Sequence, residues 1–262
     1  MMVALTIGSV LKITRKIYFT IILSFPLTVN ADFFKDTLQQ AENGNIEAQR
    51  LVGAMYDNGS GIQENKSSAI KWWKIAAERG DEESSNCLRS QLINGNKELR
   101  TYSKAIDLFL PAAMDGDIES QKWVGVIYSE GFGIEKDKNK ALYWFEKAAN
   151  QGDDRAQYLT GVFYYRGLGT KQDISKAIKW FIDASKQHHA SASNFLGTIY
   201  FDGLGVKKNY IKARELFEKA ILDGNRCANY NLGIIYRDGL GIEIDKVKAD
   251  ELFKKSNYPD CD

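Results

Sequence analysis

Cysteine, proline and histidine are scarce in this sequence. Its 262 residues include three cysteines, three prolines and two histidines. Three cysteines are too few for a scaffold built on disulfides, and three prolines leave long stretches free to form helices. Charge of either sign is not in excess either, since 35 basic and 34 acidic residues give a net charge of +1. The charge therefore favours neither nucleic acid nor an acidic membrane as a partner.

A pattern of small and aromatic residues recurs every 36 residues. Glycine fills one phase of it, alanine a second and a large aromatic ring a third. The positions are Gly59, Gly95, Gly131, Gly167, Gly203 and Gly239; Ala69, Ala105, Ala141, Ala177, Ala213 and Ala249; and Trp73, Phe109, Phe145, Phe181, Phe217 and Phe253. A fixed period of this length is the signature of a solenoid. We therefore expect an all-α solenoid with six helix-turn-helix repeats in residues 44–258 and a C-terminal tail at 259–262.

Each repeat divides into two antiparallel helices, which we call A and B. Residue types that cap helix N-termini precede nearly all of them. The positions are Asn45, Asp81, Asp117, Asp153, His189 and Asn225 for helix A, and Asn65, Thr101, Asp137, Asp173, Asn209 and Asp245 for helix B. A glycine inside helix A, as at Gly161, costs about 1 kcal/mol against alanine, so its recurrence predicts a close approach by another helix. Repeat two departs from the pattern, with Arg89 in place of that glycine, and we expect a looser link there within the same fold.

The first 31 residues do not belong to the repeat. Lys12, Arg15 and Lys16 form a basic segment, an apolar run follows from Ile17 to Leu27, and Ala31 ends the segment. This is the pattern of a secretory signal peptide cleaved before Asp32, and the run is short for a membrane span. We expect an exported protein without a membrane span after cleavage, periplasmic or secreted in a bacterium. Residues 32–43 are expected to form an N-terminal half-repeat that caps the first full one.

The repeat resembles the Sel-1-like repeat (SLR) family, a relative of the tetratricopeptide repeat. In repeat four the resembling residues are Ala156, Gln157, Leu159, Gly161, Tyr164, Gly167, Gly169, Asp173, Lys176, Ala177, Trp180, Phe181 and Ala184. The resemblance implies a right-handed superhelix of helix pairs whose concave face holds a protein or peptide partner. Members of the family mostly act as scaffolds and have no shared catalytic site. The resemblance therefore implies a non-enzymatic protein without cofactor, metal or catalytic residues, which we expect to be monomeric.

Two patterns could still carry chemistry. His188 and His189 are adjacent, and the side chains of neighbouring residues at the start of a helix point apart. A position that has diverged from the repeat pattern therefore explains them better than a metal site. Ser68 and Lys71 form an S-x-x-K sequence, which in penicillin-binding enzymes places a lysine one turn from a nucleophilic serine. Its companion motifs are missing here, although a cysteine-rich branch of the family is linked with β-lactams. A β-lactam-interacting hydrolase and a virulence-associated factor that binds host proteins stay as alternatives.

Two of the three cysteines are expected to meet. Cys227 opens helix A of repeat six, and Cys261 follows the end of its helix B. Antiparallel helices bring those ends together, so a disulfide is possible in an oxidising compartment. Cys87 occupies a position that is large and apolar in other repeats, which indicates a buried thiol.

A partner-binding groove is expected on helix A, opposite its buried face. Large and charged side chains follow this stripe along the chain, and aromatic rings dominate the energetics of interfaces. The predicted groove residues are Lys122, Tyr158, Tyr165, Phe201, Tyr230 and Arg237. The alternative is that neighbouring repeats cover these rings and make them core.

Overall fold

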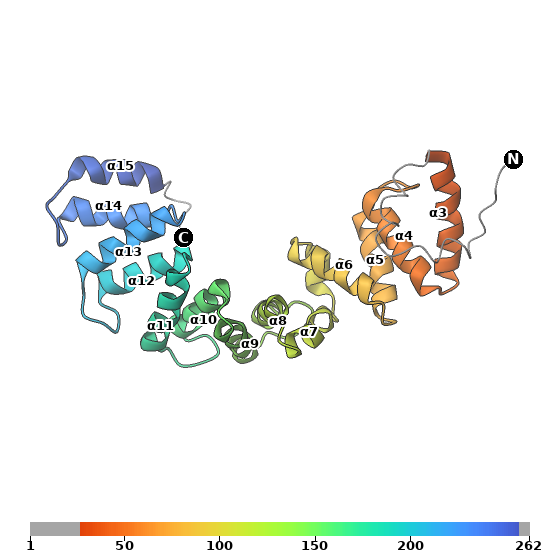
Figure 1. Ribbon diagram of the computed structural model, residues 1–262, viewed down its shortest axis with the longest axis horizontal. Coiled ribbons are helices and arrows are strands. Elements are labelled where there is room, and N and C mark those ends of the chain that lie inside the picture. Colours follow the sequence, from red (N-terminus) through yellow and green to blue (C-terminus); the bar gives the residue numbers. More distant parts are fainter. Residues whose placement is uncertain (1–26, 257–262) are drawn as a thin grey trace. The chain divides into compact units, whose positions relative to one another are not determined.

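The computed structural model describes the backbone of residues 27–256, and these residues form helices and turns without any strand (Figure 1). Most of the predicted signal peptide and the predicted C-terminal tail lie outside this range. The described residues divide into two compact parts, one ending at Arg100 and the other beginning at Thr101. No helix in the described range has the length and apolar character needed to cross a membrane.

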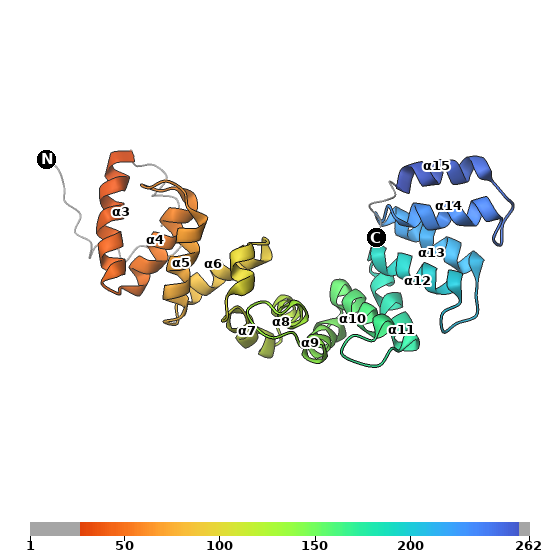
Figure 2. The same cartoon turned by 180° about the vertical axis from the view of Figure 1, so that it is seen from behind.

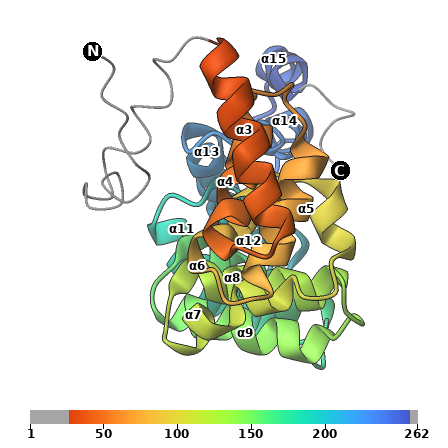
Figure 3. The ribbon, with the colours of Figure 1, turned by 90° about the vertical axis from the view of Figure 1, so that its right-hand side faces the viewer.

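The N-terminal part stacks its helices in chain order. It contains α3 (Leu27–Glu42), α4 (Ile46–Asn58), α5 (Lys66–Ala77) and α6 (Glu82–Ile93). Helix α3 packs along α4, as Figure 3 shows, and α4 and α5 form the helix pair of repeat one. Helix α3 begins at Leu27, which precedes the expected start of the half-repeat at Asp32. The buried side chains of Phe34 and Ala41 pack with Ala48, Val52 and Met55 of α4, so α3 covers the first helix of repeat one.

The C-terminal part continues the same arrangement through four repeats. Its longer helices are α8 (Ile118–Glu130), α9 (Lys138–Asn150), α10 (Asp154–Arg166), α11 (Ile174–Lys186), α12 (Ala190–Asp202), α13 (Tyr210–Leu222), α14 (Ala228–Asp238) and α15 (Lys246–Ser256). Each helix packs against the next one along the chain. The predicted all-α solenoid of helix pairs is therefore confirmed.

The predicted caps begin these helices. The side chain of Asp153 accepts a hydrogen bond from the amide of Ala156, and that of Asp173 accepts one from Lys176. Repeat six differs, because Asn225 accepts from the amide of Ala228 and α14 begins only at that residue. Local side-chain acceptors thus fix where each helix starts.

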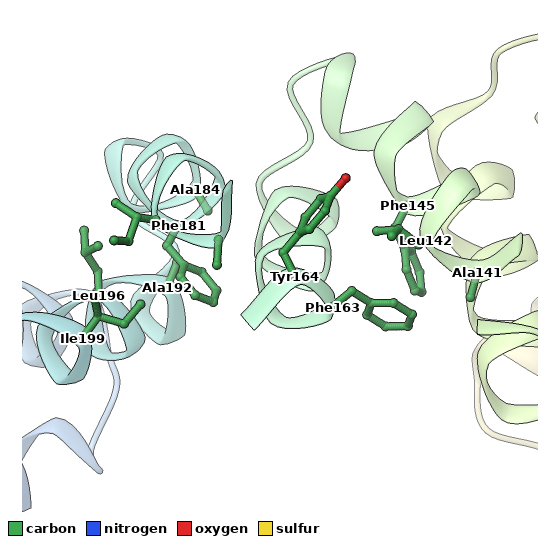
Figure 4. Packing of buried hydrophobic residues seen from close by; sticks show 12 residues of the cluster. Ala141, Leu142, Phe145, Phe163, Tyr164, Phe181, Ala184, Ala192, Leu196 and Ile199 are labelled. Carbon is green, nitrogen blue, oxygen red and sulfur yellow. The ribbon is translucent and has the colours of Figure 1, made fainter. Parts of the chain in front are cut away.

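The glycine inside helix A lies against the aromatic ring of helix B in the same repeat. A Cβ built on Gly161 would lie 2.7 Å from Cδ1 of Phe181, and Phe181 has no exposed surface. Figure 4 shows Phe181 among Ala192, Leu196 and Ile199 of the next repeat. The expected close approach is confirmed, and each ring fills the space between two repeats.

Repeat two breaks its second helix, which the sequence did not lead us to expect. In place of helix B are two 3₁₀ helices, η2 (Lys97–Thr101) and η3 (Ile106–Leu108), and the short α7 (Leu110–Met114). Pro111 lies in the first turn of α7, and proline is tolerated there but not inside a helix. Thr101, a predicted cap, ends η2 instead of starting a helix.

Candidate functional site

Two of the predicted groove residues gather around one ring. Tyr158 and Tyr165 lie on α10, and both contact Phe195 of α12, with ring centroids 5.8 and 5.9 Å apart. Tyr158 also stacks on His189 at 4.6 Å. All of these rings are partly exposed. They connect repeats four and five and leave an aromatic surface on helix A.

Phe201 and Tyr230 contact other rings than those of this cluster. Phe201 meets Tyr210 edge to face with the ring centroids 5.4 Å apart. Tyr230 contacts Phe253 of its own repeat at 5.5 Å. Both side chains are half-buried. Each aromatic ring of the predicted stripe thus packs against a neighbouring ring and leaves part of its surface exposed to solvent.

Lys122 connects two repeats. Its ammonium lies 2.8 Å from Oδ2 of Asp153 and 2.6 Å from Oε1 of Glu119, and its side chain is only 12% exposed. Burial alone would lower the pKa of Lys122, but the hydrogen bonds to these two carboxylates outweigh burial and raise the pKa. Since Asp153 caps α10, Lys122 holds repeat three to the start of repeat four. Arg50 makes the equivalent contact with Asp81 in repeat one, at 3.0 Å.

Arg237 is exposed and pairs with its neighbour in the chain. Two of its guanidinium nitrogens donate to the carboxylate of Asp238 at 2.7 and 2.8 Å. This pair lies in water, where it adds little stability, and the guanidinium stays accessible to a partner.

The two histidines have separate partners. Nδ1 of His189 accepts from the amide of Ala192, so this imidazole caps α12. Burial lowers the pKa of His189, which favours the neutral ring that this acceptor role requires. His188 has a φ of 64° at a position that is glycine in other repeats, and its Nδ1 lies 2.8 Å from Asp223. Among the residues whose side chains are described, no group of three or more His, Cys, Asp or Glu could hold a metal ion.

The S-x-x-K pair lies at the start of α5. The amide of Ser68 donates to the side chain of Asn65, which caps the helix. Lys71 is exposed on the same helix, and Ala69 between them is fully buried. The pair therefore lies where the repeat pattern alone would put it.

The cysteines differ in state. The thiol of Cys87 is free and half-buried, and burial raises its pKa to about 11, which makes it a poor nucleophile. Cys227 takes part in a disulfide bond. Cys261, its predicted partner, lies outside the described residues, so the pairing of these two stays a prediction.

Two hollows among the described residues were not predicted from the sequence. One, of about 390 Å³, is lined by Lys207, Lys208, Asn209, Tyr210, Ile211 and Gly241. The other, of about 350 Å³, is lined by Glu146, Tyr164, Lys176, Lys179, Trp180 and Asp183. A sequence signal for the first existed, because residues 203–212 contain three lysines and no acidic residue.

Comparisons with solved structures find proteins that are similar to this chain. A Sel1 repeat protein from Oxalobacter formigenes is 28% identical, and the match covers 83% of this chain and 87% of that one with a TM-score of 0.59. The protective antigen c5321 of uropathogenic Escherichia coli is also 28% identical, over 85% of this chain and 56% of that one, with a TM-score of 0.45. A comparison with curated protein sequences finds no match.

The Sel1 repeat model matches six segments of the chain, which together make up more than half of its length. They are residues 46–81, 98–117, 118–153, 154–189, 190–225 and 228–257. The longest gap between the matched segments, 82–97, contains α6, the first helix of repeat two. The chain belongs to the Sel1 repeat family.

Proposed function

We propose that the protein is an exported, non-enzymatic scaffold that binds a protein or peptide on helix A of the C-terminal part. The observation that carries this proposal is the set of partly exposed rings, Tyr158, Tyr165, Phe201 and Tyr230. Each ring is anchored by at least one aromatic neighbour and still reaches the surface. Rings held in this way bind a partner with little loss of conformational freedom. Membership in a family of repeat scaffolds supports the same function.

Capture of a partner tests this function. We expect the purified full chain to capture a partner from the envelope or secreted fraction of its own cells, and the variants Tyr165→Ala and Phe201→Ala to lose it while melting as the wild type does. Tyr143→Ala is the matched control, because Tyr143 is a 51% exposed ring on helix B. A large fall in melting temperature for the first two variants would assign those rings to the core and contradict the groove. A partner found only in host extracts would favour the virulence-associated alternative.

Export is supported by the N-terminal sequence. A basic segment, an apolar run and Ala31 stand in the order that signal peptidase substrates show. Mass spectrometry of the protein from fractionated cells tests this part of the proposal. A mature chain that begins at Asp32 outside the cytoplasm is expected, and a chain that keeps its first residues in the cytoplasm would contradict export.

A hydrolase is the alternative to a scaffold. Turnover of nitrocefin by the wild type and its loss in Ser68→Ala would establish that alternative. We expect no turnover by either protein. Ser68 and Lys71 lie in the first turns of α5, and the repeat pattern already explains this helix start.

A further inference from the structure

Neighbouring repeats fit tightly at the edge formed by the loops that join helix A to helix B. In repeats three and four, the second glycine of the loop lies against backbone of the repeat before it. A Cβ on Gly133 would collide with the carbonyl of Tyr102, and one on Gly169 with the carbonyl of Lys138. Only glycine fits at these two positions, because the loop lies directly against the backbone of the preceding repeat.

The fit loosens toward the end of the chain. A Cβ on Gly205 would lie 2.9 Å from Cγ2 of Ile174, which is a side-chain contact instead of a backbone one. At Gly241 the nearest atoms are Cβ of Tyr210 and Cγ1 of Ile211, both at 3.4 Å. The loop of repeat six therefore lies farther from the preceding repeat. The hollow of about 390 Å³ lies at this place, between the loop and the start of α13.

This hollow has cationic walls. Lys207 and Lys208 line it, and none of its six lining residues is acidic. The cap of α13 is the neutral Asn209, whereas the equivalent residues in repeats three, four and six are aspartates. Each of those three repeats thus carries an acidic residue in the segment where residues 203–212 have none. The charge here favours an anionic ligand.

Apolar surface adjoins the lysines. Ile211 lines the hollow and is 54% exposed, and Ile244, in the loop that contains Gly241, is 62% exposed. Tyr210 also lines it, and its ring is held edge to face by Phe201, one of the predicted groove residues. Figures 1 and 2 show the α12–α13 and α14–α15 loops at the same edge of this part. Apolar and cationic groups therefore meet at one place.

We propose that this hollow binds an acidic peptide segment of the partner, with a carboxylate at Lys207 and Lys208 and an apolar side chain against Tyr210 and Ile211. The inference rests on the proposed scaffold function and assigns it a place and a chemistry. A hollow of this volume falls in the range of about 300–1,000 Å³ that holds small ligands and side chains. A flat lipid surface would not use it, so a peptide is favoured over an anionic membrane.

The test is fluorescence anisotropy with the full chain and a short labelled peptide in which Glu alternates with Leu. We expect the wild type to bind this peptide, and the double variant Lys207→Glu, Lys208→Glu to bind it about tenfold more weakly. Lys171→Glu is the matched control, since Lys171 holds the position of Lys207 in repeat four, and it should bind as the wild type does. Binding should also weaken as salt is added.

A second variant tests the hollow itself. Tyr210→Ile with Ile211→Ser gives repeat five the residues of repeat four at these positions, where Ile174 closes the space. We expect this variant to melt like the wild type and to lose the peptide. Equal binding of a Gln–Leu peptide, unchanged binding by the Lys207, Lys208 variant, or no binding by the wild type would each overturn the proposal. So would a preference for phosphatidylglycerol vesicles over the peptide.

The partner from the capture experiment separates this inference from the scaffold function. If the Lys207, Lys208 variant retains that partner, the hollow is not the docking site and the scaffold function stands. If the wild type captures no partner and still binds the Glu–Leu peptide with the expected variant effects, the hollow stands and the scaffold function fails.

Discussion

Replacing Gly161 by alanine should destabilise the protein, although alanine is the better helix former. The gain in helix propensity is about 1 kcal/mol. The new methyl group would lie 2.7 Å from two carbons of the fully buried Phe181 ring. Overpacking of this kind costs about 1–3 kcal/mol. We expect the cost to lie at the upper end of this range, because the ring has no free space to move into, which leaves a net loss of about 2 kcal/mol in the free energy of unfolding.

Urea denaturation followed by circular dichroism measures this loss, and a double-mutant cycle assigns its cause. Phe181→Leu alone should also destabilise, since it removes ring surface from the core. The double variant should lose less free energy of unfolding than the sum of the two single losses, because the smaller side chain gives the methyl group room. A Gly161→Ala protein as stable as the wild type, or strictly additive losses, would refute the explanation that the ring requires glycine.

Three further predictions concern single contacts. Lys122→Met should lower the free energy of unfolding by about 1–2 kcal/mol, since it leaves the largely buried carboxylate of Asp153 without its cation; denaturation measures this, and a loss below the error would contradict it. The lowered pKa of His189 means that its contribution to stability is complete above about pH 6.5 and is lost as pH falls, because the unfolded chain binds the proton more tightly. The melting temperature should therefore fall less between about pH 7.5 and about pH 5 in His189→Asn, which keeps a cap without a titrating group. Mass spectrometry after alkylation should show Cys227 and Cys261 alkylated only when the protein is first reduced. Three alkylated cysteines without reduction would exclude the disulfide.

The sequence predicts the helical framework well because that framework depends on local rules. Caps such as Asp153 and Asp173 act within three residues, and glycines such as Gly167 act on their own backbone. These signals are complete within one repeat, so a sequence read in phase reveals them. The broken helix of repeat two was missed because Pro111 was not weighed against the repeat pattern, which favours a helix there.

The hollow at Gly241 was harder to predict because it depends on how far two repeats lie apart. The sequence around it keeps the Gly-x-Gly that the loops of repeats one, three, four and five also have. What differs is the pair Tyr210 and Ile211, where repeat four has Ile174 and a serine. The missing acidic residue in 203–212 is visible in the sequence, but its meaning becomes clear only once the space beside it is known.

Lys122 shows that a helical wheel does not account for contacts with the next repeat. A wheel separates the face of helix A that packs on its own helix B from the opposite face, and Lys122 is on the opposite side. The N-terminus of the next helix A also reaches that side, and its cap is Asp153.

The residues equivalent to Lys122 in repeats one and four also contact the cap of the next repeat. Arg50 pairs with the cap Asp81, and Tyr158 stacks on the cap His189. In repeats one and three the next cap is an aspartate and a cation contacts it, whereas in repeat four the next cap is a histidine and a ring contacts it. The residue at this position in repeats one, three and four therefore contacts the next cap, so the groove proposal depends most on Tyr165, Phe201 and Arg237, which lie about two turns further along helix A and make other contacts.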